Sequence, residues 1–167
     1  MSMPSTPAEI RALLNLQPHP EGGWFAETWR SADHVEHPLH DLHRPTSTAI
    51  YYLLEAGQQS AFHMVDSEEV WHLYAGGPAE LHLIDWEGRH ERHVLGTDLT
   101  AGERPQVVVP AGTWQATRLR PGTAFALFGC TVAPGFDFSG FEMPPAEELL
   151  TQFPQNAAII KELGRKA

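Results

Sequence analysis

The segment from Gly57 to Gly76, GQQSAFHMVDSEEVWHLYAG, constrains the fold more than any other part of the chain. Residues 60–65 and 69–75 have the composition of two short strands, and the few residues between them are typical of a tight turn. Two antiparallel strands joined in this way can present side chains on one shared face. We therefore expect His63 and Glu69 to lie close together on one face of a hairpin.

A second element, PAGTWQ at residues 110–115, places a polar amide directly after a turn. The Pro-x-Gly sequence fixes where the next strand begins. The Gln115 amide can donate to a ligand oxygen and accept from a hydroxyl, although an ordinary strand-end glutamine fits the pattern as well. Together the two elements predict a small barrel with polar groups directed into its mouth.

Short strands separated by turn signals every ~8–12 residues continue along the chain, which is typical of an antiparallel sandwich or barrel. The predicted strands are residues 24–30, 46–54, 60–65, 69–75, 80–85, 89–95, 106–109, 113–119 and 124–132. The chain therefore belongs to the mainly β class of folds.

Both ends of the chain have helical patterns. Thr6, Pro7 and Glu9 match a capping box with proline in the first turn, and this helix should end before Pro18. Apolar spacing predicts two more helices at residues 145–153 and 155–163, with Gly164 as the C-cap. We expect a single domain over residues 1–167, with a barrel core at about 22–141 and a helical tail at 145–164.

Composition limits the class of partner. The chain has 167 residues and a net charge of −10, which disfavours nucleic acid and anionic membranes as partners. An anionic substrate is not excluded, because nine of the eleven basic residues are Arg. No apolar stretch reaches the ~20 residues of a membrane span. The N-terminal residues lack a secretion signal, so we expect a cytoplasmic protein. The single cysteine, Cys130, lies in an apolar run and is expected to be a buried structural thiol.

Residues 31–45 are rich in histidine and lack periodicity. The four histidines are His34, His37, His40 and His43. A histidine-rich tract can bind metal, but no cysteine or closely paired histidine accompanies this one. We expect a solvated loop with incidental histidines.

His63 is the candidate general base, because a neighbouring carboxylate such as Glu69 can orient the imidazole and raise its pKa. The alternative is an ion pair at the barrel rim without a catalytic role. Glu68 has the opposite strand parity and is expected to face solvent.

Several other residues are candidate ligand contacts. Trp71 can stack on a ring, although filling the core is the commoner role of a tryptophan. His72 reaches the site only if a bulge reverses the strand parity. Arg30 and Arg44 can hold a phosphate or carboxylate, although Arg30, at the end of a strand, can equally be a surface cation. The phenols available as proton donors are Tyr51, Tyr52 and Tyr74, with Tyr52 placed among the ligand contacts, and Glu27 is expected to line the site beside Trp71.

These residues resemble the cupin superfamily. Its first motif, G-x5-H-x-H-x3-E-x6-G, is matched by Gly57, His63, Glu69 and Gly76, with Val65 where the second histidine belongs. Its second motif, P-x-G-x2-H, is matched at residues 110–115 with a glutamine in place of the histidine. The resemblance covers about residues 46–132. It implies a double-stranded β-helix, also called a jelly-roll barrel, and a homodimer, which open sheet edges also favour.

A narrower resemblance covers nearly the whole chain. The stretches HPEGGWFAETWRS, IYYLL, SEEVWHLYAG, VVPAGTWQA and CTVAPGFDF are similar to the little-characterised cupin branch labelled predicted sugar epimerases. Residues 23–27 are also similar to the R-G-F-F-x-E stretch of dTDP-4-keto-6-deoxyhexose 3,5-epimerases, which work without metal. Gly22 stands where those enzymes have a phosphate-gripping arginine.

The departures from the cupin motifs argue against a required metal. Metal-binding cupins use three histidines and one glutamate, whereas this chain keeps one of each and an amide, which is a poor ligand for Zn, Fe or Cu. We therefore expect no cofactor and a small polar or sugar-like ligand. The favoured hypothesis is a metal-independent isomerase or epimerase acting on a sugar-like ketone. The alternatives are a non-catalytic binding module and a metal-dependent oxygenase or hydrolase.

Overall fold

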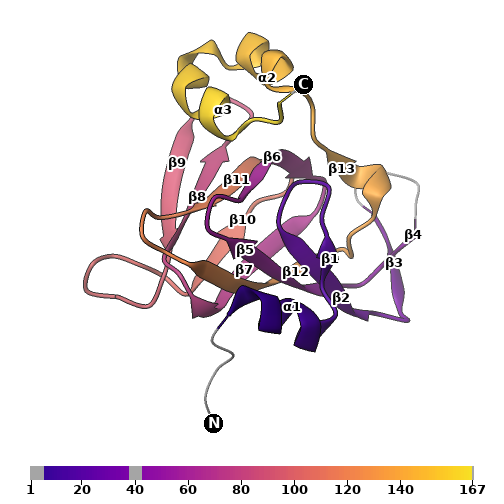
Figure 1. The fold of residues 1–167 in the computed structure, drawn as a ribbon. Helices are drawn as coiled ribbons and strands as arrows, with labels where there is room; N and C mark the ends of the chain where they lie inside the picture. Colours follow the sequence, from indigo (N-terminus) through magenta and orange to yellow (C-terminus); the bar gives the residue numbers. More distant parts are fainter. Residues whose placement is uncertain (1–5, 38–42, 167) are drawn as a thin grey trace.

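The computed structural model describes residues 6–37 and 43–166. Most of its strands form two antiparallel sheets that face each other (Figure 1), and two short strands form a separate third sheet. The elements are α1 (Pro7–Leu14), β1 (Gln17–Pro18), β2 (Trp24–Arg30), β3 (His34–Glu36), β4 (His43–Pro45), β5 (Thr48–Glu55), β6 (Gln59–Val65), β7 (Glu68–Gly76), β8 (Ala79–Ile84), β9 (His90–Leu95), β10 (Gln106–Val109), β11 (Trp114–Leu119), β12 (Phe125–Ala133), η1 (Phe138–Gly140), β13 (Phe141–Glu142), α2 (Ala146–Gln152), η2 (Pro154–Asn156) and α3 (Ala157–Leu163).

The large sheet has the strand order β1-β2-β5-β12-β7-β10, and the small sheet has the order β13-β6-β11-β8-β9. This architecture confirms the mainly β barrel expected from the spacing of strands and turns. Each predicted strand is present with nearly the predicted limits, because the strand ends coincide with glycine and proline turns.

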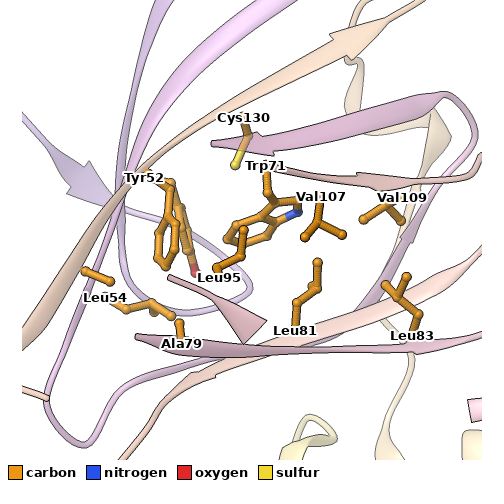
Figure 2. Close-up of a cluster of buried hydrophobic side chains, with 12 residues drawn as sticks. Tyr52, Leu54, Trp71, Ala79, Leu81, Leu83, Leu95, Val107, Val109 and Cys130 are labelled. Carbon is orange, nitrogen blue, oxygen red and sulfur yellow. The ribbon is translucent and has the colours of Figure 1, made fainter. Parts of the chain in front are cut away.

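Aromatic and aliphatic side chains fill the space between the sheets (Figure 2). The Trp71 ring packs edge-to-face on Tyr52 at 5.5 Å and on Phe128 at 5.2 Å between ring centroids. Leu81 and Leu95 close this core from the small-sheet side. Packing of this kind occupies one part of the barrel interior and leaves the other part for the polar residues described below.

The helices cover the outer faces of the two sheets. Ile10 of α1 packs against Leu53 and Leu127 of the large sheet, and the predicted capping box joins the backbones and side chains of Thr6 and Glu9. Helices α2 and α3 lie over the small sheet at the top of Figure 1. These three helices confirm the prediction from apolar spacing at both ends of the chain. None of the helices described is long and apolar enough to cross a membrane.

The connection between β6 and β7 is not the hairpin predicted from the sequence. Strand β6 pairs with β11 and β13 in the small sheet, whereas β7 pairs with β12 and β10 in the large sheet. The short link at residues 66–67 therefore crosses from one sheet to the other. As a result, His63 and Glu69 project into the barrel interior from opposite sheets instead of sharing one face.

The described parts of the histidine-rich tract, residues 31–37 and 43–45, are more ordered than the expected solvated loop. Strands β3 and β4 form a two-stranded ladder, and His37 and Arg44 are buried. Arg44 forms an ion pair with Asp66 at 3.0 Å, and the His37 ring nitrogen Nε2 lies 3.2 Å from the Ser67 hydroxyl. These contacts hold His37 and Arg44 against the β6–β7 link. His40 lies outside the described residues.

The packing of α2 and α3 against the small sheet can be tested by truncating one buried side chain. We expect Ile160→Ala to lower the free energy of unfolding by about 2–5 kcal/mol, because Ile160 is fully buried against the small sheet and the change leaves a cavity. Urea denaturation measures this loss. The matched control is Leu99→Ala, whose side chain is 60% exposed and whose effect should stay within about 0.5 kcal/mol. Equal effects of the two substitutions would contradict the packing described.

Candidate functional site

A cavity of about 160 Å³ opens between the two sheets, beside the segment that leads into β13. Both predicted catalytic residues, His63 and Glu69, line it. The full set of basic and acidic residues along its wall is His19, Glu21, Glu27, Arg30, His63, Glu69 and Asp137. Buried acids and bases gathered in one cavity are a recognised mark of a functional site.

His63 forms an ion pair with Glu21, which the sequence interpretation did not include. The His63 ring nitrogen Nε2 lies 3.0 Å from Glu21 Oε2, and Nδ1 lies 2.8 Å from the Ala61 carbonyl oxygen. Burial alone would lower the pKa of His63, but the Glu21 charge and hydrogen bond outweigh it and raise that pKa to about 9. The ring is therefore an imidazolium at neutral pH and donates from both nitrogens to the protein.

The Glu21 carboxylate is charged for the same reason. Burial alone would raise its pKa, but the neighbouring His63 and His19 lower it to about 2. A carboxylate and an imidazolium that are both buried are stable only as a pair, since removing one partner leaves an uncompensated charge.

A turn of two glycines places Glu21 in the barrel. Gly22 and Gly23 have φ angles of +110° and +70°, and a Cβ atom on Gly22 would lie 2.1 Å from the Gln59 carbonyl oxygen. The Ala61 amide donates to the Glu21 carbonyl oxygen at 2.8 Å, which fixes the turn against β6. The paired glycines beside an acid in HPEGGW were the sequence signal for this position.

Glu69 is a buried carboxyl, 7% exposed, in a different electrostatic setting. Burial raises its pKa to about 7, although His63 and a hydrogen bond from Gln115 act in the opposite direction. The Gln115 amide Nε2 donates to Glu69 Oε2 at 2.6 Å, and Trp71 Nε1 donates to Gln115 Oε1 at 2.8 Å. The buried Cys130 thiol also hydrogen-bonds to this carboxyl. Gln115 thus orients Glu69 and is not itself among the lining residues.

Glu27 and Arg30 stand together in the wall of the cavity. The Arg30 nitrogens Nε and NH2 donate to the two Glu27 oxygens at 3.0 Å and 2.8 Å, and NH1 donates to the Phe136 carbonyl oxygen at 3.1 Å. Four phenylalanines, Phe25, Phe136, Phe138 and Phe141, also line the cavity, and Phe141 stacks on the His63 ring.

Four other predicted ligand contacts lie away from the cavity wall. Trp71 is in the hydrophobic core, where its indole points between the sheets (Figure 2). The Tyr52 hydroxyl donates to the Gly22 carbonyl oxygen at 2.6 Å. His72 contacts Thr131, and Arg44 contacts Asp66. Tyr52 and Trp71 act on the site through residues that they hold.

The donors that face the cavity do not fit a divalent metal. Val65 occupies the position of the second cupin histidine and lines the cavity with its apolar side chain. Both His63 nitrogens and the Gln115 amide are bound to protein groups. Among residues 6–37 and 43–166, no group of three or more His, Cys, Asp or Glu side chains is arranged to hold a metal ion. That the protein needs no metal stays a prediction.

Comparisons with known proteins agree with this fold. The family model described as cupin superfamily (DUF985) matches residues 8–144. The uncharacterized protein YML079W of Saccharomyces cerevisiae is 32% identical over 179 residues, which cover 97% of this chain and 89% of the yeast protein. A hypothetical protein from Leishmania major has a TM-score of 0.93 at 30% identity, with 97% of this chain and 100% of that chain covered. Protein SO0799 from Shewanella oneidensis has a TM-score of 0.89 at 35% identity, with coverage of 98% and 100%.

The ion pair can be tested through the titration of His63. We expect Glu21→Gln to lower the pKa of His63 from about 9, because the substitution removes the main charge that opposes the effect of burial. NMR titration of the histidine ring protons measures this shift. The exposed carboxylate substitution Glu68→Gln should leave the titration unchanged. An unaltered His63 pKa in Glu21→Gln would rule out the pair.

The apolar position in the metal motif gives a second test. We expect Val65→His to raise the content of divalent metal in protein purified without a histidine tag, because the new imidazole would project into the cavity two residues after His63. Elemental analysis measures the metal. Val108→His, at an exposed position on β10, is the control. Unchanged metal content in Val65→His would count against the strand register of β6.

Proposed function

The chain belongs to the cupin superfamily (DUF985), and we propose that it is a metal-independent isomerase or epimerase acting on a small sugar-like ketone. The reaction is the movement of a proton on the carbon next to the carbonyl group. One observation carries the proposal: Glu69, a buried carboxyl with a pKa of about 7, lines the same cavity as the His63–Glu21 ion pair. Carboxyls whose pKa lies near neutrality are suited to both taking and returning a proton.

Glu69 is the proton-transfer residue in this proposal. Its carboxylate form removes the proton from the substrate carbon, and its acid form returns the proton to the neighbouring carbon, which is isomerisation. Epimerisation instead requires a proton to reach the same carbon from the opposite face, so a second donor is needed there. The Gln115 hydrogen bond holds the carboxyl in one orientation, and Trp71 fixes the Gln115 amide in turn. Orientation of this kind shortens the search for a reactive geometry.

His63 has a different role from the base expected from the sequence. A group with a pKa of about 9 is already protonated at neutral pH, and its two nitrogens already donate to Glu21 and Ala61. Its fixed positive charge instead stabilises the negative charge that develops on the substrate oxygen. The pair with Glu21 keeps that charge in place throughout the reaction.

His19 supplies a neutral donor in the same cavity. Burial lowers the pKa of His19, and its Nδ1 accepts from the Glu21 backbone amide at 3.2 Å, which leaves the proton on Nε2. None of the tyrosines considered as proton donors is among the lining residues. We therefore assign hydrogen bonding to the substrate oxygen to His19. Homodimerisation, which the cupin resemblance implies, remains part of the proposal, and so does the cytoplasmic location expected from the sequence.

The binding module is the second candidate function. The observation in its favour is that both His63 nitrogens are bound to protein groups. A site of this kind also suits a receptor that binds its ligand without converting it. In that case the cavity residues bind the ligand, and Glu69 moves no proton.

Wash-in of solvent deuterium distinguishes the two functions. We expect ketohexoses and their 6-deoxy derivatives, screened in D₂O by NMR, to include one that gains deuterium next to its carbonyl group. Glu69→Gln should slow this exchange about 100-fold or more, because the amide cannot take a proton. The exchange rate of the unaltered protein should rise with pH through about 7, since only ionised Glu69 is a base.

The control is Glu68→Gln, which changes the neighbouring carboxylate on the exposed face of β7 and should keep the full rate. Saturable binding without exchange would support the binding module. Exchange that survives in Glu69→Gln would refute the assignment of the base.

A further inference from the structure

The charge of the cavity wall defines the class of ligand more narrowly. We infer that the ligand is a single-ring molecule that carries an ammonium group, such as an amino sugar, and not a phosphorylated or carboxylated compound. The inference rests on the proposed function for the place of the site. It does not rest on the reaction, because a charge preference would hold for a binding module as well.

The size of the cavity limits the ligand to about one ring. Its volume is about 160 Å³, and a cavity of roughly 150 Å³ is known to accept a molecule as large as benzene. The surrounding phenylalanines offer ring contacts, with Phe136, Phe138 and Phe141 packed against one another at 5.0–6.0 Å between centroids. Aromatic faces and edges bind a compact ring and also attract a cation.

The cations in the wall are already bound to protein groups. All three nitrogens of the Arg30 guanidinium donate to Glu27 or to the Phe136 carbonyl oxygen. Both His63 nitrogens donate to Glu21 or to the Ala61 carbonyl oxygen. These bonds use three of the five N–H donors of Arg30, so an anionic ligand could reach the other two only beside the Glu27 carboxylate, whose charge repels it.

The acids in the wall outnumber the cations. Four carboxyls line the cavity, namely Glu21, Glu27, Glu69 and Asp137, against the two charged bases Arg30 and His63. The side-chain partners of Glu69 are the uncharged Gln115 and Cys130. A confined cavity with an excess of carboxyls concentrates cations and repels anions. His63 acts on Glu69 only through its charge. An ammonium group beside Glu69 would give this carboxyl a positively charged hydrogen-bond partner.

Three hexoses that differ in charge provide the test. We would titrate the full-length protein with D-glucosamine, D-glucose and D-glucuronate and measure each dissociation constant by ligand-observed NMR. Glucosamine should bind about tenfold more tightly than glucose, the size of one cation–carboxylate or cation–aromatic contact, and glucuronate should bind most weakly. The preference should shrink at high salt. Equal or tighter binding of glucose or glucuronate, or no saturable binding of glucosamine, would overturn the inference.

A pair of matched variants locates the origin of the preference. Glu27→Gln should narrow the gap between glucosamine and glucuronate, because it removes one carboxylate and frees Arg30. The control is Glu87→Gln, another arginine-paired carboxylate of equal exposure (40% against 39%) outside the cavity. An unchanged gap in Glu27→Gln would overturn the assignment. If the gap is present but no ketose exchanges deuterium, the inference stands and the proposed isomerase fails.

Discussion

The buried ion pair between His63 and Glu21 is the interaction on which the site depends. It places two opposite charges inside a barrel, where each is stable only because of the other. The pair occupies both His63 nitrogens, so it removes the imidazole from the set of free bases and metal ligands. Burial and, to a smaller extent, the negative charge of Glu21 keep the pKa of the second carboxyl, Glu69, elevated, so Glu69 becomes the group that can exchange a proton near neutrality. The division of roles between the two acids follows from their partners.

The large-scale fold was readable from the sequence because its signals are local. Turn residues mark the ends of nearly every strand, and the capping box of Thr6 and Glu9 marks the first helix. Local sequence does not determine which sheet the chain enters after a turn. A short link can join neighbours in one sheet or cross to a facing sheet, and the side-chain parity of β6 and β7 is compatible with both arrangements. His63 and Glu69 do line one cavity, as expected. They reach it from two facing sheets, however, and not from one face of a hairpin.

The residues that the sequence could not place are those whose role depends on distant partners. Glu21 precedes a strand and has no regular spacing to His63, so only the paired glycines next to it hinted at a special backbone. Trp71, Tyr52 and Gln115 were grouped as ligand contacts, but they form a layer behind the wall, in which each fixes a neighbour by one hydrogen bond. Arg44 is held by Asp66 for a similar reason, since a partly buried carboxylate at the β6–β7 link is stabilised by a cation.

The Arg44 guanidinium also joins parts of the chain that would otherwise be independent. Besides Asp66, it donates to the Gly135 carbonyl oxygen and to the Ser139 hydroxyl, on either side of the residues that carry Phe136 and Phe138 into the wall. The Asp66 amide in turn donates to the Gly140 carbonyl oxygen. The segment that carries Phe136 and Phe138 and the link that leads into β7, the strand of Glu69, are thus held by the same guanidinium. Loss of the Arg44 contacts would therefore loosen the segment that carries these phenylalanines and the β6–β7 link together.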